Sequence, residues 1–463
     1  MSSNKPEAGF NPPALAAALF GFPALPPSPR FVVALSGGVD SSALLHALCA
    51  LRGQRAFSVI AVHIDHGLQA AAATFARHCT DLCQQLQVPL EVRRVAVSPQ
   101  DARGLEGAAR DARYAALAAC VQSPRDVLLT AHHADDQAET LLLQVLRGAG
   151  VHGLAGVRGW QPFAGGALAR PLLGFTRVEL AAYLKAHAIT AVDDPMNADP
   201  RWARGFVRAE VMPRLQRRWP QANRALARAA ANAEEAASLL DTIALDDLTL
   251  VRRPDGALAI AALCNFPAPR RRNLLRYWLA SLNLKRPSQH QLAQLEEWLA
   301  HTPATRQAVL RWPGTELRRY RDALFAMAPL PPVPREWRAP WREPQSPLAL
   351  PGLGITVELV TGAGGLDPQW LTRGQWELRL RQGGERCRLV GERHRRALKD
   401  LLQARGVPPW LRPRLPLLYI DGALAALGPG WTCAEFARDR AVPGFQLAVA
   451  PLTSVRTADL SGS

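Results

Sequence analysis

Lysine is nearly absent from this chain of 463 residues, and familiar nucleotide-binding patterns are missing from its first apolar run. The only lysines are Lys5, Lys185, Lys285 and Lys399. No G-x-x-x-x-G-K-[ST] loop follows the run at 31–35, and no G-x-G-x-x-G opens the helix after it. These absences exclude a lysine-dependent phosphate loop and a dinucleotide fingerprint at this place.

Cysteine is also sparse, and its spacing forms no recognisable framework. The seven cysteines stand at irregular positions, and Cys79 and Cys83 are a helical turn apart instead of forming C-x-x-C. We therefore expect reduced cysteines with structural roles.

Long apolar runs are missing as well. The stretch 11–30 contains a short apolar patch, but proline interrupts it and no cleavage-like ending follows. We expect no membrane span, no secretion and a cytoplasmic location.

Acidic residues are outnumbered by basic ones. The chain has 55 lysines and arginines against 39 acidic residues, a formal net charge of +16. Such an excess favours a polyanionic partner, most simply a nucleic acid. Because arginine dominates in an Ala- and Pro-rich sequence, the sign of the charge is more informative than the choice of arginine.

Apolar runs at 31–35, 57–64 and 126–133 alternate with helical patterns, as in βαβ units. This order predicts an α/β fold with a parallel sheet. Ligands of such sheets lie beyond the carboxyl ends of the strands. Polar residues stand at these ends: Ser36, then Asp65 and His66, then His132 and His133.

Composition divides the remaining chain. Residues after about 220, as far as about 330, look mostly helical, a Pro-dense stretch follows, and the last hundred or so residues suggest a small mixed α/β domain. The predicted domains are 1–219 for the catalytic parallel-sheet domain, 220–332 for a helical middle domain, 333–350 for a linker, 351–450 for a C-terminal domain and 451–463 for a disordered tail.

The loop after the first run predicts an anion cradle that works with a cation. Ser36, Gly37, Gly38, Val39, Asp40 and Ser41 join a strand to a helix start, where backbone N–H groups converge. A carboxylate near phosphates is repelled unless a cation lies between them, so Asp40 implies Mg²⁺. The alternative is that Asp40 and Ser41 only cap the helix.

Two further clusters allow more than one interpretation. Helical spacing places His132, Asp135 or Asp136, and Glu139 on one face near a helix start. They could suit the helix dipole, bind a cationic substrate or ligate a metal, although the zinc spacing H-E-x-x-H is missing. Glu106, Arg110 and Arg113 share another helical face, as a surface ion pair or as an anion clamp.

Six ordered motifs resemble the tRNA(Ile)-lysidine synthetase family of PP-loop ATP pyrophosphatases. In chain order they are Ser36-Gly-Gly-Val-Asp-Ser, Asp65-His-Gly-Leu, Glu106-x-x-x-Arg110-x-x-Arg113-Tyr, His132-His-x-Asp-Asp136-Gln-x-Glu139-Thr, Arg170-Pro-Leu-Leu-Gly and Asp194-Pro-x-Asn197. The resemblance continues into residues 410–431. Met196 and Gly205 depart from it, where the family usually has serine and asparagine.

The resemblance implies a Rossmann-like N-terminal domain and a two-step reaction. ATP adenylates the 2-oxo oxygen of the wobble cytidine in the isoleucine tRNA with a CAU anticodon, and the ε-amine of L-lysine then displaces AMP at carbon 2. Residues Ser36 to Ser41 would hold the pyrophosphate end of ATP, Asp40 would bind Mg²⁺, and His66 would border the adenosine. Asp136 and Glu139 would recognise the lysine amine, with His133 and Arg113 near the reacting centre.

Basic residues predict where tRNA binds. Arg204 and Arg208, four positions apart, are expected to meet phosphates. Arg395, Arg396 and Lys399 are predicted at the start of a helix that runs to Arg405, where cations oppose the dipole and phosphates would explain them. A homodimer is left open.

Three alternatives compete with this interpretation. A tRNA thiolase would use the same loop but needs a cysteine arrangement that Cys79 and Cys83 do not supply. A small-molecule amide-forming synthetase would not need the basic C-terminal region. A nucleotide-gated RNA-binding protein would never release pyrophosphate.

Overall fold

The computed structural model describes residues 9–65, 72–96, 104–192, 202–301, 309–334, 336–428, 431–438 and 442–451. They form two compact units, Met1–Asp247 and Leu248–Ser463. Among the described residues, no helix combines the length and apolar character that a membrane span requires.

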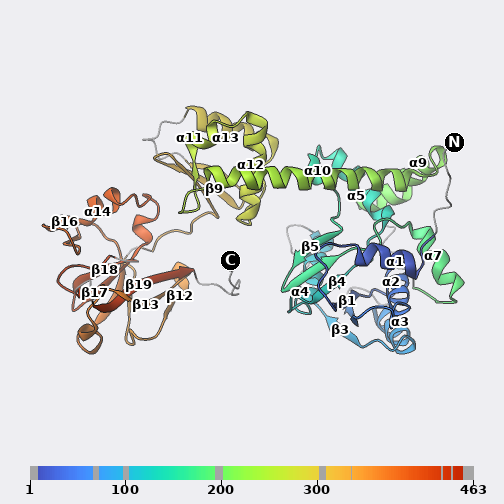
Figure 1. The fold of residues 1–463 in the computed structure, drawn as a ribbon, viewed down its shortest axis with the longest axis horizontal. Coiled ribbons are helices and arrows are strands. Elements are labelled where there is room, and N and C mark those ends of the chain that lie inside the picture. Colours follow the sequence, from blue (N-terminus) through green and yellow to red (C-terminus); the bar gives the residue numbers. More distant parts are fainter. Residues whose placement is uncertain are drawn as a thin grey trace. The chain divides into compact units, whose positions relative to one another are not determined.

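The first unit is built on a six-stranded sheet in the order β3-β2-β1-β4-β6-β5 (Figure 1). Its strands are β1 (Arg30–Ala34), β2 (Ser58–Asp65), β3 (Leu90–Arg94), β4 (Asp126–Leu129), β5 (Trp160–Phe163) and β6 (Gly166–Ala169). All neighbouring strands run parallel except β5, which is antiparallel to β6 at the edge. The predicted α/β class and N-terminal parallel sheet are therefore confirmed.

The helices of this unit precede, connect or follow these strands in the chain. They are α1 (Pro12–Phe20), α2 (Val39–Cys49), α3 (Ala72–Gln85), α4 (Gly104–Ala118), α5 (Ala134–Leu146), α6 (Val151–Leu154), α7 (Arg177–Ala186), α8 (Ala203–Phe206), the π-helix η2 (Val207–Val211), α9 (Met212–Arg218) and the long α10 (Ala222–Val251). The apolar N-terminal patch forms α1, whose Leu15 and Leu19 are fully buried in the core of this unit.

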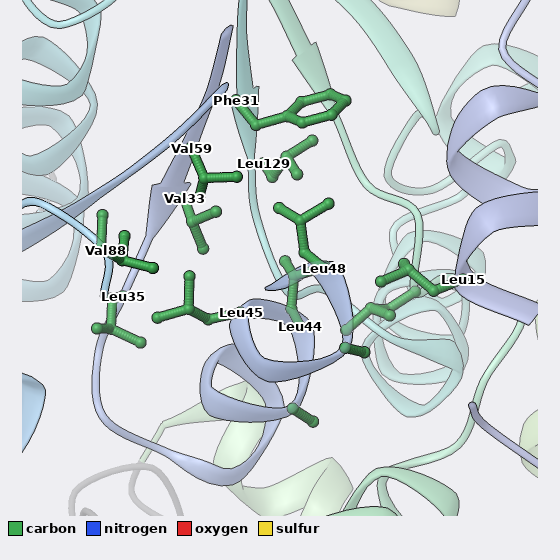
Figure 2. Packing of buried hydrophobic residues seen from close by; sticks show 14 of the residues in the cluster. Leu15, Phe31, Val33, Leu35, Leu44, Leu45, Leu48, Val59, Val88 and Leu129 are labelled. Atoms are coloured by element: carbon green, nitrogen blue, oxygen red, sulfur yellow. The ribbon is translucent and has the colours of Figure 1, made fainter. Parts of the chain in front are cut away.

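Alternation along β1 fills both faces of the sheet. Phe31 and Val33 pack with Leu44 of α2 on one face (Figure 2), whereas Val32 packs with Leu117 of α4 on the other. Parallel sheets are covered on both faces, so their strands are apolar throughout instead of alternating with polar residues. This explains why the run at 31–35 was recognisable from the sequence.

The strand order reverses between β1 and β4. The chain passes from β1 through α2 to β2 on one side, and after β3 it returns through α4 to β4 on the other side of β1. Ligands of open α/β sheets bind at such a switch point, outside the carboxyl ends of the strands. The polar residues after β1 and β4 therefore lie at the expected place.

An ion pair between the half-exposed Arg30 and the buried Asp126 ties β1 to β4 at the opposite end of these strands. Asp126 accepts hydrogen bonds from Arg30 Nε at 2.7 Å and Arg30 Nη2 at 2.6 Å, and from the backbone N–H groups of Gln122 and Ser123. The Arg30 guanidinium lowers the pKa of Asp126 against the opposing effect of burial. The pair therefore stabilises the charged carboxylate in the folded state.

Asp126→Asn is expected to lower the free energy of unfolding of this unit by about 2 kcal/mol, because hydrogen bonds to a charged group contribute about 1.5–3 kcal/mol. Glu91→Gln, which removes the charge from the more exposed Glu91–Arg93 pair, should change it by less than about 0.5 kcal/mol. Hydrogen exchange of the β1 and β4 amides during urea titration measures both. Equal effects of the two substitutions would show that the Arg30–Asp126 pair stabilises this unit no more than an exposed ion pair does.

The second unit begins with helices, as the sequence predicts, and with a sheet that the sequence analysis did not predict. Helices α11 (Ile260–Cys264), α12 (Ala268–Ser281) and α13 (Gln289–His301) accompany the sheet β7-β10-β9-β8, with β7 (Leu258–Ala259), β8 (Val309–Trp312), β9 (Thr315–Tyr320) and β10 (Ala323–Met327). Buried Trp278, Leu317 and Leu324 join helices and sheet in one core. The middle region is thus helical with an added antiparallel sheet.

The rest of the second unit is rich in strands. One sheet has the order β11-β14-β17-β18, another β12-β13-β19, and β15 pairs with β16. These elements are β11 (Arg338–Pro340), β12 (Leu348–Leu350), β13 (Ile355–Ala363), β14 (Trp376–Leu380), β15 (Arg386–Cys387), β16 (Arg396–Ala397), α14 (Leu398–Ala404), β17 (Pro416–Ile420), β18 (Ala423–Leu427) and β19 (Pro443–Pro451), with 3₁₀ turns at Pro351–Leu353, Pro368–Thr372 and Arg412–Arg414.

Part of the predicted linker belongs to these sheets. Strand β11 pairs with β14, and β12 pairs with β13, although the sequence analysis assigned 333–350 to a linker. Trp341 and Leu350 are buried in the C-terminal core, which outweighs the surrounding prolines. Pro340 is tolerated because β11 is an edge strand.

Candidate functional site

The loop between β1 and α2, which the sequence predicts as an anion cradle, turns at a glycine in the left-handed region. Gly37 adopts a φ of 84°, and a Cβ there would lie 3.2 Å from Cys79 Sγ. The Ser36 and Ser41 hydroxyls are 3.1 Å apart, and Ser41 Oγ donates to the Gly38 carbonyl at 3.2 Å. Glycine is needed at position 37 for both conformation and space.

Asp40 stands in the first turn of α2, above this loop. Its side chain is 29% exposed, and its Oδ1 atom is buried without a hydrogen-bond partner among the described residues. The capping alternative predicted for Asp40 and Ser41 does not describe this helix start, since Gly38 is the N-cap and no side chain caps it. This oxygen lies 4.0 Å from Arg177 Nε in an ion pair but accepts no hydrogen bond, and a carboxylate oxygen of this kind fits a Mg²⁺ ligand.

His133 ends the β4 connection and begins the second half of the site. It is the N-cap of α5, and its backbone N–H donates to Asp136 Oδ2 at 3.1 Å. The Nε2 atom of His133 lies 3.5 Å from Asp40 Oδ2 and 3.6 Å from Asp136 Oδ2. The ring therefore joins the α2 loop to α5.

Two adjacent histidines differ in protonation, His133 being charged and His132 neutral. Burial opposes the charged form of His133, but hydrogen bonds to Asp135 and Asp40 outweigh it and raise its pKa to about 10. Burial and nearby arginines lower the pKa of His132 to about 3. His132 precedes α5 instead of lying on it, and its Nδ1 is 2.9 Å from Thr130 Oγ1. At neutral pH the site thus contains an imidazolium beside a neutral imidazole.

The nitrogen Nδ1 of His133 has two neighbours on Asp135, the backbone N at 3.2 Å and the carboxylate Oδ2 at 3.3 Å. A neutral ring would accept from the backbone N–H, whereas an imidazolium donates to the carboxylate. Three carboxylates surround the ring, so we assign the imidazolium with Nδ1–H directed at Asp135.

Asp136 and Glu139 are paired with two arginines. Arg204 donates to Asp136 Oδ1 at 2.9 Å and to Glu139 Oε2 at 2.8 Å. Arg208 donates to Glu139 Oε1 at 2.7 Å and to Asp136 Oδ1 at 3.3 Å. Glu139 is only 2% exposed, so these guanidiniums neutralise a buried charge. The arginines predicted to meet tRNA thus contact the acidic pair predicted to bind lysine.

Arg113 lies in a neighbouring cationic group. Arg110 and Arg113 of α4 lie over the ring of Tyr114, 5.1 and 5.8 Å from its centroid. Burial lowers the pKa of the Arg113 guanidinium, and the nearby charges of Arg110 and Arg204 lower it further. Arg170, which is 5% exposed, donates to the Arg158 carbonyl at 2.6 Å. Such clustered cations suit an anionic ligand.

The structure brings together one set of predicted residues: Ser36, Gly37, Gly38, Val39, Asp40, Ser41, His133, Asp136, Glu139, Arg204 and Arg208. Predicted residues His66, Asp194, Met196 and Asn197 lie outside the described residues, as does the side chain of Glu106. Gly205, the other departure from the family pattern, is buried in α8.

The predicted C-terminal basic residues belong to the second unit. The helix there ends where predicted, but it begins only at Leu398, because Arg396 and Ala397 pair with β15 as strand β16. Lys399 alone of the cluster is therefore in the first turn, and the dipole argument for Arg395 and Arg396 was wrong. Both arginines remain at least 42% exposed.

Comparisons with known proteins cover most of the chain. A PP-loop domain family matches residues 17–215, a TilS substrate binding domain matches 258–325, and a TilS substrate C-terminal domain matches 376–449. A tRNA(Ile)-lysidine synthase of Xanthomonas campestris pv. campestris (strain 8004) is 44% identical over 406 residues, covering 88% of this chain and 91% of that protein. The chain belongs to the tRNA(Ile)-lysidine synthase family.

Further relatives support this family, whose members are ligases that use ATP to modify tRNA, and the chain is an enzyme of this kind. The tRNA(Ile)-lysidine synthase of Alkalilimnicola ehrlichii is 42% identical over 426 residues, covering 91% of this chain and 94% of that protein. A solved U34-tRNA thiolase from Methanococcus maripaludis is 14% identical with a TM-score of 0.40 and covers 48% of this chain and 77% of that one. A solved TilS C-terminal domain is 20% identical with a TM-score of 0.21, covering 26% of this chain and all of that one. Neither structural likeness bears on function.

Sequence reasoning left Asp135 undecided and missed Asn223 in the site of this lysidine synthase family member. Asp135 contacts His133, and Asn223 at the start of α10 donates to Asp135 Oδ1. The sequence analysis left open whether Asp135 or its neighbour Asp136 mattered. Asn223 lies 88 residues from Asp135, and no local pattern indicates such a contact.

Proposed function

We propose that this chain joins the ε-amine of L-lysine to carbon 2 of the wobble cytidine in the isoleucine tRNA with a CAU anticodon. ATP first adenylates the 2-oxo oxygen of cytosine and pyrophosphate leaves. The amine then attacks carbon 2, AMP departs, and the amine gives up a proton. The change redirects codon reading from AUG to AUA.

The observation that carries this proposal is the meeting of an anion cradle and an acidic pair across His133. The loop of Ser36 to Ser41 would hold the pyrophosphate end of ATP, and Asp40 would hold Mg²⁺, which stabilises negative charge on the leaving pyrophosphate. His133 and Arg113 would lie near the reacting centre, with His66 bordering the adenosine.

The acidic pair of Asp136 and Glu139 can bind an amine only if the amine displaces one of the arginines now bound to it. All four oxygens of Asp136 and Glu139 accept hydrogen bonds from Arg204, Arg208 or the His133 backbone. An ammonium ion of lysine would replace one of these guanidinium contacts. The displaced arginine would then be available for a substrate carboxylate or phosphate.

Cysteine chemistry favours this reaction over the thiolase alternative. Burial raises the pKa of Cys79 to about 12 and that of Cys83 to about 11. Both side chains are buried free thiols. A sulfur-transferring site uses thiolates, which these two cysteines do not provide at neutral pH.

One experiment tests the function directly. The full chain is incubated with ATP, Mg²⁺, radiolabelled lysine and either the isoleucine tRNA or a methionine tRNA with the same CAU anticodon. Label should enter only the isoleucine tRNA and only with ATP. Pyrophosphate release without label in tRNA would refute lysine ligation, and the absence of both would leave only nucleotide or RNA binding.

The C-terminal basic cluster is expected to bind the body of the tRNA. Replacing Arg395, Arg396 and Lys399 together with glutamine should leave ATP binding intact and reduce the salt slope of tRNA binding by up to about three phosphate contacts. The slope is measured from dissociation constants across a salt series. Replacing Arg338, Arg342 and Arg373, exposed arginines of the same unit, is the charge-matched control. An equal change in both triple variants would show a general charge effect.

Location and assembly remain proposals. A cytoplasmic location follows from a tRNA substrate and from cysteines kept as free thiols. A homodimer stays a prediction, which sedimentation of the chain with and without tRNA would check.

A further inference from the structure

The carboxylate of Asp135 joins three helices at one point. Its Oδ2 atom accepts the N–H of Arg177, the first residue of α7, at 2.9 Å, and its Oδ1 atom accepts from Asn223 at the start of α10. The same Oδ2 lies 3.3 Å from His133 Nδ1, at the start of α5. Donors from α7 and α10 therefore fix the carboxylate that faces His133.

The His133 ring is sensitive to this contact. The ring is only 4% exposed, and its two nitrogens face different carboxylates. Nδ1 faces Asp135, while Nε2 faces Asp40 and Asp136. Rotating the ring by half a turn would break both sets of contacts. A carboxylate behind a histidine fixes the direction in which the other nitrogen points.

We propose that Asp135 is a positioning residue that holds the His133 ring with Nε2 directed at Asp40 and Asp136. The proposal rests on the proposed function, since His133 is placed there beside the reacting centre. The Asp135 side chain contacts His133 directly, and it reaches Asp40 only indirectly, through the backbone of Arg177, whose Nε lies 4.0 Å from Asp40 Oδ1. Its removal would let the ring turn without removing any group from the loop of Ser36 to Ser41.

Glu179 offers a matched control, because it also links α7 to α10. It accepts from Thr176 at the N-cap of α7 and from Arg224 of α10 at 2.8 Å, yet none of its described contacts reaches His133. Glutamine at position 179 keeps the capping-box geometry. If Asp135 only docked helices, Glu179→Gln would cause a comparable loss.

The test is a double-mutant cycle in the full chain. Pyrophosphate release and lysidine formation are measured for the wild type, Asp135→Asn, His133→Gln and the double variant, together with melting temperatures. We expect Asp135→Asn to lower kcat by about 10–100-fold with KM for ATP changed less than about threefold. In the His133→Gln background the same substitution should cost less than about threefold, because its target is gone. Glu179→Gln should stay within about twofold of the wild type.

Independent losses in the two backgrounds, or an equal loss in Glu179→Gln, would overturn the proposal. A wild-type rate in His133→Gln would also overturn it. If Asp135→Asn does not fold, Asn223→Ala replaces it in the cycle, since this variant removes one donor that fixes Asp135 and should lose activity only while His133 is present. If the wild type releases pyrophosphate but forms no lysidine, lysine ligation fails, and the cycle on pyrophosphate release still decides the role of Asp135.

Discussion

Asp40→Asn is expected to abolish pyrophosphate release. Its rate should fall by at least about 100-fold, while the affinity for tRNA stays nearly unchanged. Asparagine keeps the size of the side chain but removes the negative charge that would hold Mg²⁺. Loss of a metal that stabilises leaving phosphates is worth several kcal/mol. The buried His133 imidazolium loses the charge of Asp40 but keeps Asp135 and Asp136 as anionic partners.

The measurement separates chemistry from binding. Pyrophosphate release is followed with tRNA present across a Mg²⁺ series, and tRNA affinity is measured without ATP. Asp81→Asn, a neutralised exposed aspartate on α3, is the control and should behave as the wild type. Wild-type turnover by Asp40→Asn at low Mg²⁺ would show that Asp40 does not bind Mg²⁺.

The sheet of the first unit was predictable because its central strands are buried on both faces. Phe31, Val33 and Leu129 stand in continuous apolar runs, which short local patterns reveal. Strands β3 and β5 carry charged or polar residues at partly exposed positions and lack that signal. Strands β1, β2 and β4 and their polar ends were therefore found, whereas the edge strands β3 and β5 and the four-residue interior strand β6 were not.

The middle sheet and the two strands before the C-terminal domain escaped prediction for related reasons. Strand β9 reads Thr-Glu-Leu-Arg-Arg-Tyr, and its charges obscure the alternation that buries Leu317. Prolines around Trp341 suggested a linker, although one large buried aromatic side chain fixes the segment to the core. Burial in the folded chain outweighs local propensity in both cases.

The ion pairs of the site could not be found from the sequence. Arg204 is 65 residues from Glu139, and the motifs gave both residues separate roles. Which of several arginines meets a buried carboxylate depends on how α8 and η2 pack on α5. The residue types of the site were thus predictable, whereas their pairing required the fold.

Asp136→Asn and Glu139→Gln are expected to impair lysine use far more than adenylation. An ammonium loses charge-assisted hydrogen bonds to each neutral amide, each worth about 1.5–3 kcal/mol, or about 10–100-fold in KM for lysine. Pyrophosphate release should change only a few-fold, because neither side chain touches the loop of Ser36 to Ser41 in the described contacts. Lysine-dependent AMP release and pyrophosphate release, measured separately, distinguish the two steps.

Removing either carboxylate also leaves Arg204 and Arg208 with fewer partners, so a control must test the arginine-bearing segment itself. Glu210→Gln removes the partner of Arg214, 3.4 Å away, on the same segment and should leave KM for lysine within about twofold. Melting temperatures show whether the buried site has reorganised. If the two variants of the acidic pair lose pyrophosphate release and lysine use equally, the carboxylates act in the metal and nucleotide site, and lysine recognition must be assigned to other residues.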